Sequence, residues 1–302
     1  MNPTIESAPV LEARGLVKRY GALTALDRVD LTVRAGEAVA IMGASGSGKT
    51  TLLHCLAAII APDSGSVRLT APGTAARELV GMPDADRSAV RRSSLGFVFQ
   101  DHLLLPELTA VENAALPLLL VGTARAAAEA HAAAWLGALG LAGMENRRIG
   151  ELSGGQAQRV AIARAQVTGA PVVFADEPTG ALDSTTSSEV LDALLHATTG
   201  QGRSLVVVTH DAEVARRCDR VLRMRDGRIV DSSVAEQSVA HWRFWKRKGW
   251  SGGVRGPEPF WAKSRMAGWH RSMSWSQARI SWKSWRCVFA SNRNWRSLPP
   301  CE

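Results

Sequence analysis

The sequence is poor in several features that would place it in other classes of protein. It has one tyrosine and four cysteines in 302 residues, and no two cysteines form a CxxC pair. A disulfide framework is therefore not expected, and a reducing compartment is favoured. The longest apolar run, residues 114–121, contains Pro117 and is far shorter than the roughly 18 to 20 residues of a membrane-spanning helix. The first thirty residues lack a basic segment followed by an apolar one, so no secretory signal is expected.

Most of the chain carries no net positive charge, although the net charge of the whole chain is +8. Residues 235–302 contain 13 of the 36 Lys and Arg residues, 3 of the 28 Asp and Glu residues and nine of the ten tryptophans. The first 234 residues therefore carry a net charge of −2. The overall charge gives no reason to expect that the main domain binds nucleic acid.

The C-terminal segment, residues 233–302, is also poor in the residues that form a core. From residue 235 onward it has only five Val, Leu or Ile residues, too few to bury a core of its own. We expect a disordered appendage or the product of a shifted reading frame. The alternative is functional, because Trp242, Trp245, Lys246 and Arg247 could lie on an anionic membrane surface or bind nucleic acid.

The pattern of apolar residues predicts an α/β fold. Short alternating runs separated by glycines predict a small antiparallel sheet within residues 11–39. A buried strand at Ala38–Met42 leads into a glycine-rich loop and then a helix at Leu52–Ile60, before Pro62. The order strand, glycine loop, helix is typical of phosphate-binding proteins.

From residue 103 onward, the pattern of residues predicts helices followed by buried strands. Residues 103–166 are rich in Ala and Leu and predict a largely helical insertion, with one helix at Ala124–Leu139. Continuous apolar runs at Val172–Ala175 and Leu205–Val208 are typical of strands buried in a parallel sheet. A helical pattern at Ser187–His196 lies between them.

The sequence GASGSGKT at Gly43–Thr50 follows the P-loop pattern Gly-x-x-x-x-Gly-Lys-Thr. Glycines let consecutive backbone amides surround phosphate groups at the N-terminus of the following helix. Lys49 would contact the β and γ phosphates, and the Thr50 hydroxyl would bind Mg²⁺. A flexible Gly/Ser loop has the same composition, but the flanking strand and helix are the context that the motif requires.

A second acidic site follows a hydrophobic strand. Asp176 and Glu177 end the apolar run that begins at Val172, at the edge where a parallel sheet binds its ligands. Asp176 is the candidate for the magnesium shell, and Glu177 is the candidate base that polarises the attacking water. An exposed acidic turn is the alternative, which the P-loop in the same chain disfavours.

The segment Leu152–Gln156 reads LSGGQ, and with this motif the chain resembles the ATPase subunits of ABC transporters. The resemblance covers about residues 10–232, the expected ATP-binding domain, after an N-terminal tail at residues 1–9. It implies an α/β P-loop NTPase fold: a RecA-like parallel-sheet core, an antiparallel β subdomain, and a helical subdomain at about residues 101–166.

The resemblance also implies a set of site residues. Tyr20 would stack on adenine, Gln100 would contact Mg²⁺ and the attacking water, and His210 would contact the γ-phosphate. The implied catalytic residues are Glu177, His210 and Gln100, and the implied Mg²⁺ ligands are Thr50, Gln100 and Asp176. The residues implied to bind ATP are Tyr20, Gly43, Ala44, Ser45, Gly46, Ser47, Gly48, Lys49, Thr50, Thr51, Ser153, Gly154, Gly155, Gln156 and Asp183.

The resemblance implies partners as well. In this family the signature at Ser153–Gly155 binds the γ-phosphate held by the P-loop of a second subunit, so a head-to-tail homodimer that traps two ATP molecules is expected. Asp183 would couple the two sites. The dimer would dock on a membrane permease at the cytoplasmic face of the cell membrane, and no specific nucleic acid is expected.

Two segments, Phe97–Asn113 and Glu177–Asp183, are most similar to the lipoprotein-releasing, macrolide-export and cell-division group. An FtsX-like or MacB-like permease and a role in export or extracytoplasmic mechanical work are therefore expected. The chain departs from this group at Ala57–Ile59, where glycines are usual, and at Ala181, where Asn is common. The alternative function is a soluble, non-transport ABC ATPase with a regulatory or nucleic-acid-linked role.

Overall fold

The computed structural model describes residues 8–234. The expectations for the first residues of the N-terminal tail and for residues 235–302 therefore lie outside the described part of the chain. Among residues 8–234, none of the helices has the length and apolar character needed to cross a bilayer.

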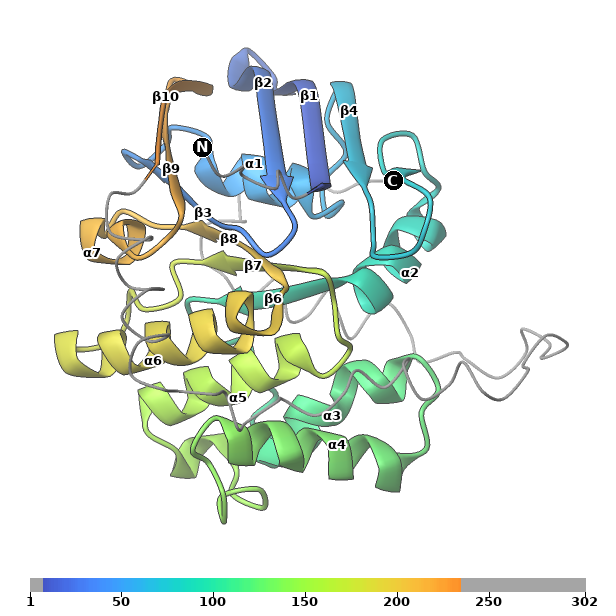
Figure 1. The fold of residues 1–302 in the computed structure, drawn as a ribbon, viewed down its shortest axis with the longest axis vertical. Coiled ribbons are helices and arrows are strands. Elements are labelled where there is room, and N and C mark those ends of the chain that lie inside the picture. Colours follow the sequence, from blue (N-terminus) through green and yellow to red (C-terminus); the bar gives the residue numbers. More distant parts are fainter. Residues whose placement is uncertain (1–7, 235–302) are drawn as a thin grey trace, which may run out of the picture. The chain divides into compact units, whose positions relative to one another are not determined.

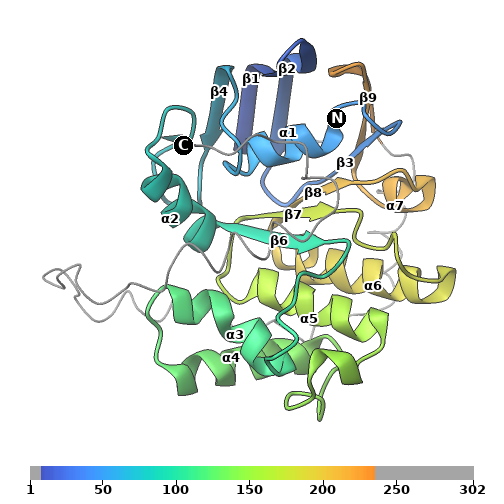
Figure 2. The same ribbon diagram turned by 180° about the vertical axis from the view of Figure 1, so that it is seen from behind.

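The strands form two sheets (Figures 1 and 2). The first is antiparallel, in the order β2-β1-β4-β5. The second has the order β10-β9-β3-β8-β7-β6, and only its edge strand β10 runs antiparallel to its neighbour. The strands of the first sheet are β1 (Pro9–Tyr20), β2 (Leu23–Arg34), β4 (Ser64–Leu69) and β5 (Arg77–Glu78). Those of the second are β3 (Ala38–Gly43), β6 (Leu95–Phe99), β7 (Val172–Asp176), β8 (Ser204–Val208), β9 (Arg220–Arg225) and β10 (Arg228–Val234).

The central strands of the six-stranded sheet are apolar on both faces, because both faces are covered. In β7 and β8, Val173 and Leu205 pack on one side, whereas Phe174 and Val206 pack on the other. This alternation divides the buried residues into two hydrophobic cores, one on each face of the sheet. The expected buried strands at residues 172–175 and 205–208 agree with β7 and β8.

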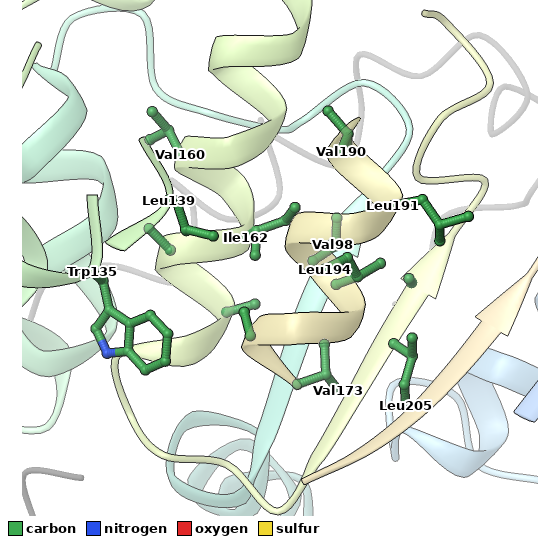
Figure 3. Packing of buried hydrophobic residues seen from close by; sticks show 14 of the residues in the cluster. Val98, Trp135, Leu139, Val160, Ile162, Val173, Val190, Leu191, Leu194 and Leu205 are labelled. Carbon is green, nitrogen blue, oxygen red and sulfur yellow. The ribbon is translucent and has the colours of Figure 1, made fainter. Parts of the chain in front are cut away.

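One core contains the larger helices. These are α3 (Ala110–Leu120), α4 (Arg125–Ala138), α5 (Gly154–Gln166) and α6 (Ser184–Ala197). In Figure 3, Ile162 of α5 and Leu194 of α6 pack over Val98 and Val173 of the sheet. The helix expected at residues 124–139 agrees with α4, and the one expected at 187–196 begins one turn earlier as α6. The shorter helices are η1 (Ile149–Glu151), η2 (Thr199–Gln201), α2 (Asp84–Ser94) and α7 (Ala212–Arg216).

The other core encloses α1 (Lys49–Leu56), which lies between the two sheets (Figure 1). The sequence predicted a helix as far as Ile60, and this is wrong because the chain turns at Ala57. Ala58 adopts a left-handed backbone with φ 54°, and the Arg91 side chain donates a hydrogen bond to its carbonyl. A left-handed residue just after the last turn is a common way to end a helix, here without the usual glycine.

Candidate functional site: a phosphate-binding loop facing two carboxylates

The P-loop, residues 43–50, joins the end of β3 to the start of α1 and contains left-handed turns. Gly46 and Gly48 have φ values of 79° and 97°, which L-residues with a side chain rarely adopt. A Cβ atom on Gly48 would also lie 2.3 Å from the carbonyl oxygen of Ala25 in β2. Glycine is therefore required at Gly48 by both backbone conformation and packing.

The Lys49 ammonium lies over the loop. Its Nζ donates hydrogen bonds to the carbonyl oxygens of Gly43 (2.8 Å) and Ala44 (2.9 Å). The loop is also held from outside, because the amide of Gly227 in the β9–β10 turn donates to the Ser47 carbonyl (3.1 Å). A hollow of about 530 Å³ lies beside residues 43–47, with His210 and residues 223–226 on its other sides. A lysine ammonium and a helix N-terminus at the same loop are the two groups that favour binding of an anion there.

Asp176 ends β7 next to the beginning of α1. Thr50 hydrogen-bonds its carboxylate, but burial and the neighbouring Glu177 raise the pKa of Asp176 to about 6. A half-buried carboxylate with a raised pKa is stabilised in its charged form when a cation lies beside it.

Glu177 has a left-handed backbone with φ 46°, an uncommon conformation for a residue of this type. Its amide donates to the Val208 carbonyl (2.9 Å), which holds it against β8. Its Oε1 lies 2.9 Å from Nδ1 of His210. The structure thus brings Glu177 and His210, which are 33 residues apart, into direct contact.

The oxygen ligands at this edge fit Mg²⁺ in chemical type. Mg²⁺ prefers hard oxygen donors and is usually bound by one or two carboxylates together with substrate phosphates. Thr50 and Asp176 supply a hydroxyl and a carboxylate that already contact each other. In residues 8–234, no cluster of three or more His, Cys, Asp and Glu side chains is arranged to hold a metal ion.

The Tyr20 ring is held at the end of β1 by Thr51 and by two neighbours that the sequence analysis did not select, Lys18 and Asp63. Its hydroxyl contacts the Thr51 side chain, and the Lys18 ammonium lies 5.6 Å from the ring centroid. Asp63 fixes this segment by accepting hydrogen bonds from Lys18 Nζ (2.9 Å) and from the Arg19 amide (2.6 Å). No motif marks Asp63 in the sequence, because its partners lie more than 40 residues away. Tyr20 is 38% exposed, so its ring is accessible to a planar ligand.

Gln100 follows the last residue of β6 and lies beside the loop after β7. A Cβ atom placed on Gly180 would meet Nε2 of Gln100 at 3.2 Å. Phe99 pairs in register with Asp176, so the sheet places Gln100 next to Glu177. The backbone pairing accounts for the proximity of these residues, which lie far apart in the sequence.

The LSGGQ motif forms the start of α5. Ser153 and Gln156 form a capping box, in which the Ser153 amide donates to Oε1 of Gln156 (2.9 Å) and the Gln156 amide donates to Oγ of Ser153 (3.3 Å). Asp183 caps α6 with its side chain, which accepts a hydrogen bond from the Thr186 amide (3.0 Å). These polar side chains therefore also have local structural roles.

The signature lies on the other side of the six-stranded sheet from α1. α5 packs in the helical core, whereas α1 packs in the core between the sheets (Figure 2). The described contacts of Gly154 are with the segment after β6 and the loop before α6: His102 Nε2 lies 3.1 Å from its carbonyl oxygen, and a Cβ atom placed on Gly154 would lie 3.2 Å from Cδ2 of Leu182. The structure therefore gathers the P-loop, Asp176, Glu177, Gln100 and His210, and places the signature apart from the P-loop.

Comparison with known proteins identifies the class to which this fold and site belong. The family described as "ABC transporter" matches residues 26–180. A structure titled as a dimeric, post-hydrolysis state of the ATP-binding cassette MJ0796, bound to ADP and Pi, is similar with a TM-score of 0.66 and 35% identity. It covers 75% of this chain and 99% of that one. The chain belongs to the ABC transporter family, as an ABC ATPase with the expected P-loop NTPase fold.

Two curated relatives show where the chain fits within the family. The lipoprotein-releasing system ATP-binding protein LolD of Bordetella avium is 47% identical over 224 residues, 73% of this chain and 95% of LolD. The pyoverdine export ATP-binding/permease protein PvdT of Pseudomonas putida is 42% identical over 240 residues, 78% of this chain. The chain spans only about a third (36%) of the length of PvdT, so the likeness concerns its ATP-binding part.

Proposed function

We propose that this protein hydrolyses ATP to ADP and phosphate and, as a homodimer, drives a membrane permease at the cytoplasmic face of the membrane. The observation that carries the proposal is the contact between Glu177 and His210 at the sheet edge that also holds Asp176 and the P-loop. This edge combines an anion-binding loop with a carboxylate base, the two parts that phosphoryl transfer to water needs.

The bound nucleotide would lie along the P-loop. The phosphates would accept hydrogen bonds from the amides of residues 43–51, and Lys49 would exchange its loop carbonyl partners for phosphate oxygens. Tyr20 would stack on adenine, with Lys18 and Asp63 fixing the ring. Mg²⁺, held by Thr50, Asp176 and Gln100, would neutralise charge on the β and γ phosphates.

Glu177 is the proposed general base. His210 contacts its carboxylate, and its backbone amide is held by the Val208 carbonyl of β8. A fixed orientation favours proton abstraction from a water placed in line with the γ-phosphate. The exposed His210 ring would reach the γ-phosphate, and this contact would report the presence of the nucleotide to Glu177.

The position of the signature supports a dimer in which each ATP is shared. Ser153, Gly154 and Gly155 form an anion-binding helix N-terminus. Gly154 contacts His102 in the segment after β6, and Gly155 packs on α6. A second copy, placed head to tail, would present this N-terminus to the γ-phosphate held by the first copy, and Asp183 would lie near the junction. The similar MJ0796 cassette is described as dimeric.

The relatives favour a transport role over a soluble regulatory or nucleic-acid-linked role. LolD is named as part of a lipoprotein-releasing system, and PvdT as an export ATP-binding/permease protein. The partner proposed here is an FtsX-like or MacB-like permease that performs export or extracytoplasmic mechanical work. Copurification with a permease encoded beside this gene tests the proposal, and ATPase stimulation by that permease supports it.

Hydrolysis and dimerisation are tested together with Glu177→Gln in the full chain. The variant should bind ATP but hydrolyse it at least about 100-fold more slowly, so that ATP shifts it to a dimer on sizing chromatography. Glu189→Gln is the matched control, because Glu189 is an exposed residue of α6, and it should hydrolyse ATP normally. A Glu177→Gln variant that hydrolyses ATP at the normal rate contradicts the assignment.

A further inference from the structure

Gln158 is a fully buried polar residue in the middle of α5, with 0% of its surface exposed. Its Nε2 donates one hydrogen bond to the carbonyl of Pro178 (2.7 Å) and one to the carbonyl of Phe99 (3.2 Å). Its Oε1 is buried and has no hydrogen-bond partner among the described residues. Burying an amide with an unsatisfied oxygen costs free energy, which offsets part of the stabilisation from its two hydrogen bonds.

The two carbonyls that Gln158 binds belong to the neighbours of two site residues. Pro178 directly follows Glu177, whose left-handed backbone needs support from its surroundings. Phe99 directly precedes Gln100. One amide group thus fixes the backbone on both sides of the place where the attacking water would be bound.

We propose that Gln158 is a positioning residue for ATP hydrolysis, which holds the backbone that carries Glu177 and Gln100 and connects it to the helix that begins at the signature. The inference rests on the proposed function, since it needs Glu177 to be the base. Gln158 itself does not touch the reacting atoms. It acts through the two backbone carbonyls.

The position of Gln158 on α5 gives the contact a second consequence. Gln158 lies five residues after Ser153, about 7.5 Å along the helix axis. In the proposed dimer the start of α5 binds the ATP of the other subunit, whereas Gln158 contacts the site of its own subunit. If α5 shifts when its N-terminus binds that ATP, the Gln158 amide shifts with it. The hydrogen bond to the loop after Glu177 of the same subunit would then change, so the two ATP sites would be coupled.

The same helix contains a matched control. Gln166 is also fully buried, but its Oε1 accepts from Arg203 at the opposite end of α5 from the signature. Changing either glutamine to methionine keeps a similar volume and removes an amide. Gln158→Met removes donors next to the site, whereas Gln166→Met removes an acceptor away from it.

The test compares wild type, Gln158→Met and Gln166→Met as full chains, by steady-state ATP hydrolysis with Mg²⁺ and by thermal unfolding. Gln158→Met should lower kcat by about 10- to 100-fold, as expected for a displaced catalytic group, with KM for ATP changed less than about two-fold. Gln166→Met should lower the unfolding midpoint with kcat within about two-fold of wild type. If Gln158→Met does not fold, Gln158→Asn keeps the amide, withdraws its donors from the two carbonyls by one methylene and should show the same loss of kcat.

A second measurement separates positioning from a general structural defect. Adding Gln158→Met to Glu177→Gln should slow the residual hydrolysis by less than about three-fold, because the base whose loop Gln158 holds is already absent and only its effect on Gln100 remains. Multiplicative losses, a raised KM with unchanged kcat, or equal losses of kcat in Gln158→Met and Gln166→Met would overturn the inference. If wild type hydrolyses ATP and Gln158→Met matches it, only this inference fails. If wild type and Gln166→Met hydrolyse no ATP, the proposed function fails and the inference with it.

Discussion

Gly155, the second glycine of the signature, allows α5 to pack closely against α6. A Cβ atom at this position would lie 2.3 Å from Cγ2 of Thr186, about 1.5 Å closer than ordinary carbon contacts. Its next neighbours, Cβ of Thr186 and Cγ2 of Val190, would lie at an acceptable 3.8 Å. Gly155→Ala therefore creates a clash with a single methyl group.

Two opposing effects set the size of the change. Forcing a methyl group into a packed interface costs about 2 to 3 kcal/mol at this overlap, whereas replacing Gly by Ala in a helix contributes up to about 1 kcal/mol. Gly155→Ala should thus destabilise the protein by about 1 to 2 kcal/mol. Thr186→Ser removes Cγ2 and keeps the backbone amide that donates to the capping side chain of Asp183. In that background, Gly155→Ala should be neutral or stabilising by up to about 1 kcal/mol.

The assay is urea unfolding of wild type, both single variants and the double variant. Gly137→Ala measures the effect of helix propensity alone, because a Cβ atom at that position would have no neighbour within 4 Å. A coupling free energy of about 2 to 3 kcal/mol is expected between positions 155 and 186. Additive effects, within about 0.5 kcal/mol, would refute the packing argument. A double variant that is stable but hydrolyses no ATP would assign Gly155 a separate contact with the γ-phosphate.

Three further predictions concern other parts of the chain. Burial lowers the pKa of His54 to about 4, so the unfolded chain binds a proton between pH 6.5 and 4 that the folded chain does not. Stability should therefore fall by up to about 3 kcal/mol as the pH drops through this window, and His54→Leu should flatten that part of the urea-midpoint profile. Asp63→Ala, which frees Lys18 and the backbone before Tyr20, should raise KM for ATP several-fold with kcat unchanged in steady-state assays. Asn113→Leu should lower the free energy of urea unfolding by about 2 to 4 kcal/mol, because the fully buried Asn113 amide satisfies several backbone groups that would lose their partners.

The parts of the site that sequence analysis could predict are those encoded by contiguous residues. The glycines, the lysine and the threonine of Gly43–Thr50 are close together in sequence, so the motif alone predicts the loop. The flanking apolar runs predict the strand before it and the helix after it. The position of Asp176 followed from the end of an apolar run. The end of α1 was predicted incorrectly, because Ala58 adopts a left-handed conformation that its side chain disfavours and that is supported by the distant Arg91.

The supporting contacts could not be predicted, because they join residues that are distant in sequence. Gln158 and Phe99 are 59 residues apart, and Lys18 and Asp63 are 45 apart. Neither pair lies in a pattern of fixed spacing, since the lengths of the intervening segments do not determine which atoms meet. The motifs therefore predict which groups perform the chemistry, whereas the fold alone specifies what holds those groups in place.

One consequence follows from the way α5 is held. Within a span of five residues, Gly154 contacts the His102 ring, Gly155 packs on Thr186, and Gln158 binds the backbone beside Glu177. A helix is stiff over this length, so these contacts cannot change independently of one another. Movement of the signature towards a partner's ATP must therefore either carry the loop after Glu177 with it or break the bond from Gln158. In both cases the base of one site responds to the occupancy of the other, and hydrolysis at the two sites of the proposed dimer should be cooperative.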